Sequence, residues 1–227
     1  MQILGTAIGQ RLTASRLRAS IATVVACLIV GADLALVSWS DKFTTEGRNT
    51  LALLALAANV WLVQGDPASI GFVAPRQGWW YWIRSGMLIA LAITLTFLLG
   101  FGAWVWSGRE VPRLPVAYPS NIASDLLAMC LFAPLFEETI YRLAICVPLC
   151  ASLGPKAAIV VSGLAFGGLH VLYGDPSPEQ VLGGFVIAWA YLKSESILVP
   201  LMLHSLGNLF VLSWKLLNWY WVQGYFL

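Results

Sequence analysis

The sequence contains few charged residues, and this scarcity limits what kind of protein it encodes. Only 11% of its 227 residues are Asp, Glu, Lys or Arg, whereas a soluble globular domain contains about 25%. The formal net charge is +2, and no basic cluster indicates contact with phosphates, so we expect no nucleic-acid partner. The composition therefore excludes an ordinary soluble domain.

Cysteine and histidine are scarce as well. The four cysteines form no Cys-x-x-Cys pair and lie within apolar stretches, so we interpret them as packing residues rather than disulfide or metal sites. Only two histidines occur, His170 and His204, and neither belongs to the His-Glu-x-x-His motif of zinc proteases. Each histidine therefore carries weight in any assignment of function.

Hydrophobic residues make up 59% of the chain. Several apolar runs reach or exceed the roughly 18 residues that indicate a membrane-spanning helix. We predict an all-α polytopic membrane protein with about seven or eight transmembrane helices and the catalytic site in the C-terminal helices. The expected spans are 19–40, 50–64, 83–106, 121–150, 157–173, 180–192 and 197–213, and the aromatic tail 214–227 is expected to form an interfacial helix or a short eighth span.

The N-terminal segment bears on orientation. Arg11, Arg16 and Arg18 precede the first apolar run, which is too long for a secretory signal peptide and lacks a convincing cleavage site. The positive-inside rule therefore predicts a cytoplasmic N-terminus. Short loops and compact length favour an integral, multi-pass protein of the bacterial inner (cytoplasmic) membrane. Asp33, inside the first run, is interpreted as a hydrogen-bonding group within the helix rather than a catalytic one.

Two adjacent acids and an arginine interrupt the fourth apolar run. Charges at bilayer depth cost on the order of 2.5–3.5 kcal/mol each, so they usually mark function and face a protein interior. Glu138 and Arg142 are four residues apart with the acid first, the better order for a helical ion pair. Glu137 points about 100° away on an ideal helix and stays available for chemistry. Pro134, one turn earlier, frees a backbone carbonyl and favours a bend.

Two later spans each carry a pair with the same spacing. Phe166 and His170 are four residues apart, as are His204 and Asn208, so each pair lies on one helical face. A single histidine in such a helix is more often a hydrogen-bonded packing residue than a catalyst. One interpretation is therefore a polar network that fixes helix register, and the other is a reaction centre. Ser205 points about 100° from His204, which argues against a serine–histidine dyad.

The three patterns, Glu-Glu-x-x-x-Arg, Phe-x-x-x-His and His-x-x-x-Asn, occur in an order that resembles the CPBP intramembrane proteases. That family includes CAAX prenyl proteases of the Rce1 type, bacteriocin-processing and Abi proteins, and myxosortase-like members. The resemblance covers about residues 120–213. It suggests a single membrane domain, 1–227, made of variable N-terminal spans (1–120), a CPBP-like catalytic core (121–213) and an aromatic C-terminal helix (214–227).

The resemblance implies peptide-bond hydrolysis within or at the edge of the membrane. Glu137 and His170 would activate a water molecule, and His204 and Asn208 would stabilise the tetrahedral oxyanion. Loss of one such donor typically slows a reaction about 10²- to 10³-fold. The implied substrate is a membrane-associated peptide or a C-terminal protein segment in the lipid bilayer.

Glu138 and Arg142 are expected to hold the site in shape. We expect no cofactor, with zinc as the alternative, because two histidines and a glutamate form a familiar zinc-binding set. Asn208, one turn after His204, is a poor zinc ligand, which favours a metal-free, glutamate-dependent mechanism.

Two other classes of function remain open at this point. The chain could be a non-catalytic immunity or scaffold protein that retains the fold of these proteases. It could also be a transporter or proton channel, because intramembrane acids and histidines form proton relays. The transporter is disfavoured because no inverted repeat relates the two halves and the polar residues gather in the second half.

Overall fold

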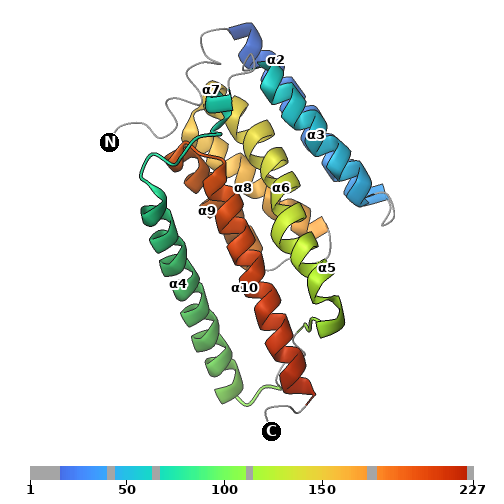
Figure 1. Ribbon diagram of the computed structural model, residues 1–227, viewed down its shortest axis with the longest axis vertical. Helices are drawn as coiled ribbons and strands as arrows, with labels where there is room; N and C mark the ends of the chain where they lie inside the picture. The colour runs from blue at the N-terminus through green and yellow to red at the C-terminus, as the bar shows by residue number, and fades with distance from the viewer. Residues whose placement is uncertain (1–15, 40–43, 63–66, 111–114, 173–177, 224–227) are drawn as a thin grey trace. The chain divides into compact units, whose positions relative to one another are not determined.

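The computed structural model describes residues 16–39, 44–62, 67–110, 115–172 and 178–223. Over these ranges the protein is helical and contains no strand (Figure 1), which confirms the predicted all-α class. The basic N-terminal segment around Arg11 and the last residues of the aromatic tail, 224–227, lie outside the described residues.

A helix occupies each range in which a span was predicted. The principal elements are α2 (Arg16–Trp39), α3 (Thr44–Leu62), α4 (Trp79–Trp106), the succession α5 (Ile122–Leu127), η3 (Ala128–Phe132), α6 (Ala133–Glu138), η4 (Thr139–Cys146) and α7 (Val147–Leu153), then α8 (Pro155–Leu172), α9 (Pro178–Ser194) and α10 (Leu198–Val222). Short 3₁₀ turns, η1 (Pro67–Ile70) and η2 (Pro119–Asn121), complete the set.

Two boundaries differ from the sequence-based expectation. The helix α3 begins at Thr44, ahead of position 50, where the second span was expected to start. The last helix, α10, continues through Ser213 to Val222, so the first part of the aromatic tail extends the preceding helix. Residues 214–222 contain neither proline nor glycine, so no helix-breaking residue ends α10 before Val222.

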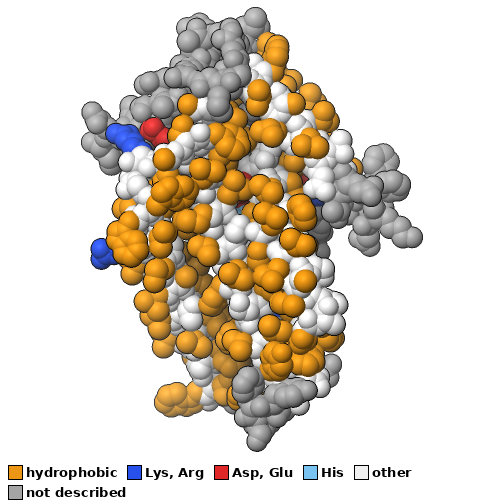
Figure 2. All heavy atoms as spheres, viewed as in Figure 1, with side chains coloured by type: hydrophobic (Ala, Val, Ile, Leu, Met, Phe, Trp, Pro, Cys, Tyr) orange, Lys and Arg blue, Asp and Glu red, His pale blue; other side chains and the backbone are white. Residues whose placement is uncertain are grey.

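Among the described residues, α4 and α8 are long and apolar enough to cross a bilayer. The helix α4 exposes large hydrophobic side chains along its length, among them Trp80, Leu99 and Trp106. Figure 2 shows hydrophobic side chains over most of the visible face, with the most prominent Lys and Arg side chains at its left edge. A surface of this kind suits acyl chains rather than water. The total of seven or eight spans stays a prediction.

The chain divides into two compact units. The first comprises the described residues within Met1–Gln77 and Leu135–Met202, and the second those within Gly78–Pro134 and Leu203–Leu227. In the first unit, η4 packs against α2, α3 and α8. The buried side chains of this unit include Ile140, Tyr141, Leu143, Ile145, Phe166 and Leu169.

Glycines let α8 and α9 approach closely inside the first unit. A Cβ atom on Gly184 would lie 3.0 Å from the backbone oxygen of Gly163, whereas one on Gly183 would meet nothing within 4 Å. The close approach of the two helices therefore depends on Gly184 and not on Gly183. Backbones can come this near only where side chains are absent.

The second unit is held by contacts between α10 and segments near α4 and α5. The rings of Phe97 and Trp214 meet edge-on with centroids 5.5 Å apart. Asn218 donates a hydrogen bond to the backbone oxygen of Pro115 at 3.1 Å, and the amide of Ala117 donates to Lys215 at 3.1 Å. These contacts fix the C-terminal half of α10 against the segment that precedes α5.

Candidate active site

Glu138 and Arg142 form the predicted ion pair. Both side chains have no exposed surface, and Arg142 Nε lies 2.9 Å from Glu138 Oε2. The N–H does not point along this line, so the attraction is electrostatic rather than an aligned hydrogen bond. Arg142 Nη1 donates to Ser162 Oγ at 3.1 Å, and Ser162 in turn donates to the backbone oxygen of Tyr141 at 2.8 Å. The pair therefore links η4 to α8 in the interior, which suits a structural role.

The backbone between the two charges was not predicted. Residues Thr139–Cys146 form a π-helical stretch, η4, rather than a regular α-helix. Such stretches are rare and occur frequently at functional sites, because they turn side chains away from their α-helical positions. The spacing of four residues still allowed the ion pair to be predicted, because neighbouring turns face each other in both kinds of helix.

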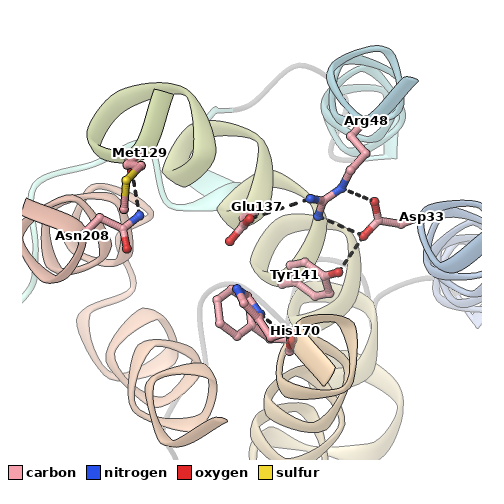
Figure 3. Close-up of polar contacts among 8 residues, drawn as sticks. Asp33, Arg48, Met129, Glu137, Tyr141, His170 and Asn208 are labelled. Carbon is pink, nitrogen blue, oxygen red and sulfur yellow. Dashed lines mark hydrogen bonds and ion pairs between the residues drawn. The ribbon is translucent and has the colours of Figure 1, made fainter. Parts of the chain in front are cut away.

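Glu137 belongs to a different buried network (Figure 3). Its side chain is 9% exposed, and its Oε1 lies 3.9 Å from Arg48 Nη1. Arg48 binds Asp33 at two points, Nε to Oδ1 at 2.6 Å and Nη2 to Oδ2 at 3.3 Å. The hydroxyl of Tyr141 donates to the same carboxylate at 2.6 Å. Glu137 is thus separate from the Glu138 pair, as expected, but it is not isolated from other charges.

Sequence reasoning missed Arg48. Asp33 was correctly interpreted as a hydrogen-bonding group, but its partners come from α3 and η4 rather than from its own helix. The position of Asp33 inside an apolar run is the signal that could have led to these partners. A carboxylate in the middle of an apolar helix needs a cation nearby, and Arg48 is the first arginine after that helix.

His170 is oriented by its own helix. Its Nδ1 lies 2.9 Å from the backbone oxygen of Phe166. Because a carbonyl only accepts, the neutral ring carries its proton on Nδ1 and leaves the Nε2 lone pair to accept. The ring centroids of Phe166 and His170 are 4.5 Å apart. In Figure 3 the side chains of Glu137 and His170, from α6 and α8, point toward one another.

The contacts of Phe166 explain why the Phe-x-x-x-His motif begins with a large aromatic residue. Its ring meets Tyr141 edge-on with centroids 5.4 Å apart, and Arg142 Cζ lies 5.2 Å from the ring centre. The same side chain therefore touches the histidine, the tyrosine of the Asp33 network and the arginine of the Glu138 pair. A smaller residue here would leave all three without support.

In the second unit, the side chain of Asn208 replaces a missing backbone hydrogen-bond donor. In the π-helical η3, the N–H of Ala133 donates to the oxygen of Ala128, five residues back. The next donor in this series would be Pro134, which has no N–H. Met129, whose carbonyl that donor would have reached, instead accepts a hydrogen bond from Asn208 Nδ2 at 2.7 Å (Figure 3). The carbonyl expected to be freed by the proline therefore belongs to Met129.

The six predicted site residues are distributed over both units. The first unit holds four of them and the second holds two. Those in the first unit are Glu137, Glu138, Arg142 and His170, and those in the second are His204 and Asn208. His204 is buried, with 7% of its surface exposed.

No group of three His, Cys, Asp or Glu side chains among the described residues lies close enough to hold a metal ion. The zinc alternative would require such a group. A site without a metal stays a prediction.

Comparison with known families gives one result. Residues 119–210 match the Rce1-like family of type II CAAX prenyl endopeptidases. All six predicted site residues fall inside this Rce1-like segment, and the match confirms the resemblance to the CPBP proteases over those residues. The helices α2, α3 and α4 fall outside it. Comparisons with curated proteins and with solved structures give no match.

Proposed function

We propose that the protein is an intramembrane endopeptidase that hydrolyses a peptide bond in a membrane-associated peptide or C-terminal protein segment. The observation that carries this proposal is the different setting of the two adjacent acids. Glu138 is paired with Arg142 at 2.9 Å inside the Rce1-like segment, whereas Glu137 lies 3.9 Å from an arginine that is bound more closely to Asp33. One acid is held in a short ion pair, and the other lies farther from its neighbouring cation.

In the proposed reaction, Glu137 and His170 activate a water molecule. The lone pair on His170 Nε2 and the Glu137 carboxylate are the groups proposed to accept a proton from it. One of them removes a proton from water, whose oxygen forms a bond to the peptide carbonyl carbon. The tetrahedral intermediate then collapses, the C–N bond breaks, and the same proton passes to the leaving amine.

His204 and Asn208 are proposed to stabilise the oxyanion of that intermediate. The hydrogen bond to Met129 uses one N–H of the Asn208 amide and fixes the amide plane. The second N–H of that amide group is then held in a defined direction before substrate arrives. Donors held in advance lose little reorganisation energy during the reaction, and each is typically worth about 10² to 10³ in rate.

We propose that the protein acts as a multi-pass component of a bacterial inner membrane, with a cytoplasmic N-terminus. The two helices that satisfy the criterion for crossing a bilayer, α4 and α8, support the membrane setting. Reporter fusions to each terminus, active on only one side of the membrane, test the orientation. A periplasmic N-terminus would contradict it.

The proposed activity is tested by comparing peptide termini in membranes from cells that contain wild-type protein or Glu137→Ala. Mass spectrometry is expected to find trimmed termini only with the wild type. Glu179→Ala, an exposed acid on α9, is the matched control and is expected to trim normally. Equal trimming by Glu137→Ala would remove the proposed base. Absence of any trimmed product, with a wild-type phenotype in all variants, would favour the scaffold.

A second arm of this experiment tests the zinc alternative. A chelator is expected to leave trimming unchanged in purified membranes. Loss of trimming that is restored by added zinc would show that the metal-free mechanism is wrong, while leaving the protease assignment intact.

A further inference from the structure

The helices α2 and α3 lie outside the Rce1-like segment, yet they supply charged side chains to Glu137. Asp33 comes from α2 and Arg48 from α3, and both are almost completely buried. Buried charges are costly unless they are paired, so their presence here requires an explanation. Their mutual pairing accounts for how the two charges can be buried. The direction in which Arg48 extends, toward Glu137, accounts for why they are there.

The guanidinium of Arg48 is held in one orientation. Two of its nitrogens contact the two oxygens of Asp33, at 2.6 and 3.3 Å. A two-point contact fixes the plane of the guanidinium as well as its position. The central carbon of the guanidinium, Arg48 Cζ, also lies 4.7 Å from the ring centre of Phe136, the residue before Glu137. The nitrogen directed to Glu137, Nη1, is therefore set in place by contacts that do not involve Glu137.

The contacts close into a circuit. Tyr141 follows Glu137 by one turn, and its hydroxyl donates to Asp33 Oδ2 at 2.6 Å. The path runs from Glu137 to Arg48, to Asp33, to Tyr141 and back along the helix to Glu137 (Figure 3). Any rotation of this turn changes two of these distances at once. The circuit therefore ties the direction of the Glu137 carboxylate to the α2–α3 helix pair.

The charges within the circuit indicate that Arg48 orients the Glu137 carboxylate rather than neutralises it. One guanidinium faces two carboxylates, and its distance to Asp33 is 2.6 Å against 3.9 Å to Glu137. Coulombic attraction falls with distance, so Asp33 takes the larger share of the positive charge. The remaining attraction to Arg48 Nη1 biases the direction of the Glu137 carboxylate.

We propose that Arg48, held by Asp33, is a positioning residue for Glu137, and that the α2–α3 pair is thereby part of the catalytic apparatus. The consequence for catalysis rests on the proposed function. The orientation of the carboxylate itself does not, and it can be measured separately.

Three variants test this. Arg48→Gln removes the cation but leaves Asp33 buried without it, which is expected to destabilise the protein for reasons unrelated to Glu137. The double variant Asp33→Asn/Arg48→Gln removes both charges together, so neither is left buried without its partner, and it is the decisive one. Arg48→Lys keeps the charge but loses the two-point contact. Arg76→Gln, which breaks the exposed Arg76–Glu195 ion pair, is the matched control.

The first readout is kinetic and uses full-length protein in detergent with a fluorogenic peptide built on a terminus that the wild type trims. The folded double variant is expected to lose about 10- to 100-fold in kcat, with KM changed by less than about twofold, because the base is misaligned. Arg48→Lys is expected to fall between it and the wild type, and Arg76→Gln to match the wild type. A folded double variant with wild-type kcat would show that the pair serves folding alone.

The second readout does not depend on activity. The infrared difference between each protein and the same protein with Glu137→Gln isolates the carboxylate stretching band of Glu137. The band is expected to move in the double variant and to stay in place in Arg76→Gln. An unmoved band in the double variant would overturn the proposal. If the band moves but no peptide is trimmed by the wild type, the orientation stands and the proposed function fails.

Discussion

The amide of Asn208 donates a hydrogen bond to the backbone oxygen of Met129 at 2.7 Å. It does so because Pro134 cannot continue the π-helical hydrogen bonding that the Ala133 N–H makes with Ala128. A side chain that belongs to one sequence motif is thus oriented by a proline that belongs to none. This relationship gives Pro134 a role distinct from bending the helix.

Replacing Pro134 with alanine tests that role. Alanine supplies the missing N–H, which competes with Asn208 for the Met129 carbonyl. Because proline is about 3 kcal/mol less favourable than alanine inside a helix, Pro134→Ala is expected to raise or maintain thermal stability. The same variant is expected to lower kcat about 10-fold or more, as a displaced oxyanion donor does. Met129→Leu keeps the carbonyl and serves as the control, and wild-type kcat in Pro134→Ala would contradict the account.

The two adjacent acids are expected to respond differently to neutralisation. Glu138→Gln leaves Arg142 buried beside a neutral group, which typically costs about 3–5 kcal/mol of stability. Glu137→Gln is expected to keep the wild-type melting temperature within a few degrees and to abolish trimming. Thermal unfolding in detergent, followed by a trimming assay, separates the two. Comparable losses of stability in both variants would show that the division between structural and reactive acid is wrong.

Ser162 joins the Glu138–Arg142 pair to the backbone of η4. Ser162→Ala leaves a buried donor on Arg142 and a buried acceptor on Tyr141 without that hydroxyl, so we expect a loss of about 1–3 kcal/mol. Ser152→Ala removes only an ordinary bond to the preceding turn of its own helix and is expected to cost less than about 0.5 kcal/mol. Equal unfolding free energies for the two variants would argue against the link.

The neighbouring glycines of α9 make a matched pair. Gly184→Ala places a methyl group 3.0 Å from the backbone oxygen of Gly163, which cannot move aside easily. We expect it to destabilise the protein by about 1–3 kcal/mol, the usual cost of overpacking. Gly183→Ala meets no atom within 4 Å and is expected to stabilise the helix by up to about 1 kcal/mol. The order of melting temperatures, with Gly183→Ala above and Gly184→Ala below the wild type, checks this.

Much of the fold follows from apolar runs and breakers, because each run has one stable backbone state in an apolar environment. The Glu138–Arg142 pair was predictable because it depends only on local spacing. The π-helical stretches η3 and η4 were not, since one extra residue in a turn leaves no mark in the hydrophobic pattern. Arg48 was missed for a related reason. Its contact with Glu137 joins segments distant in the sequence, and Arg48 precedes position 50, where the second span was expected to start.

The most direct test of the central claim is the source of the oxygen in the newly formed peptide terminus. Wild-type protein and the Glu137→Gln variant are each incubated, in water enriched in oxygen-18, with an intact peptide that the wild type trims. The product is analysed by mass spectrometry. The account predicts one labelled oxygen in the new carboxyl terminus with wild-type protein and no product with Glu137→Gln. Labelled product formed at the wild-type rate by Glu137→Gln would contradict it.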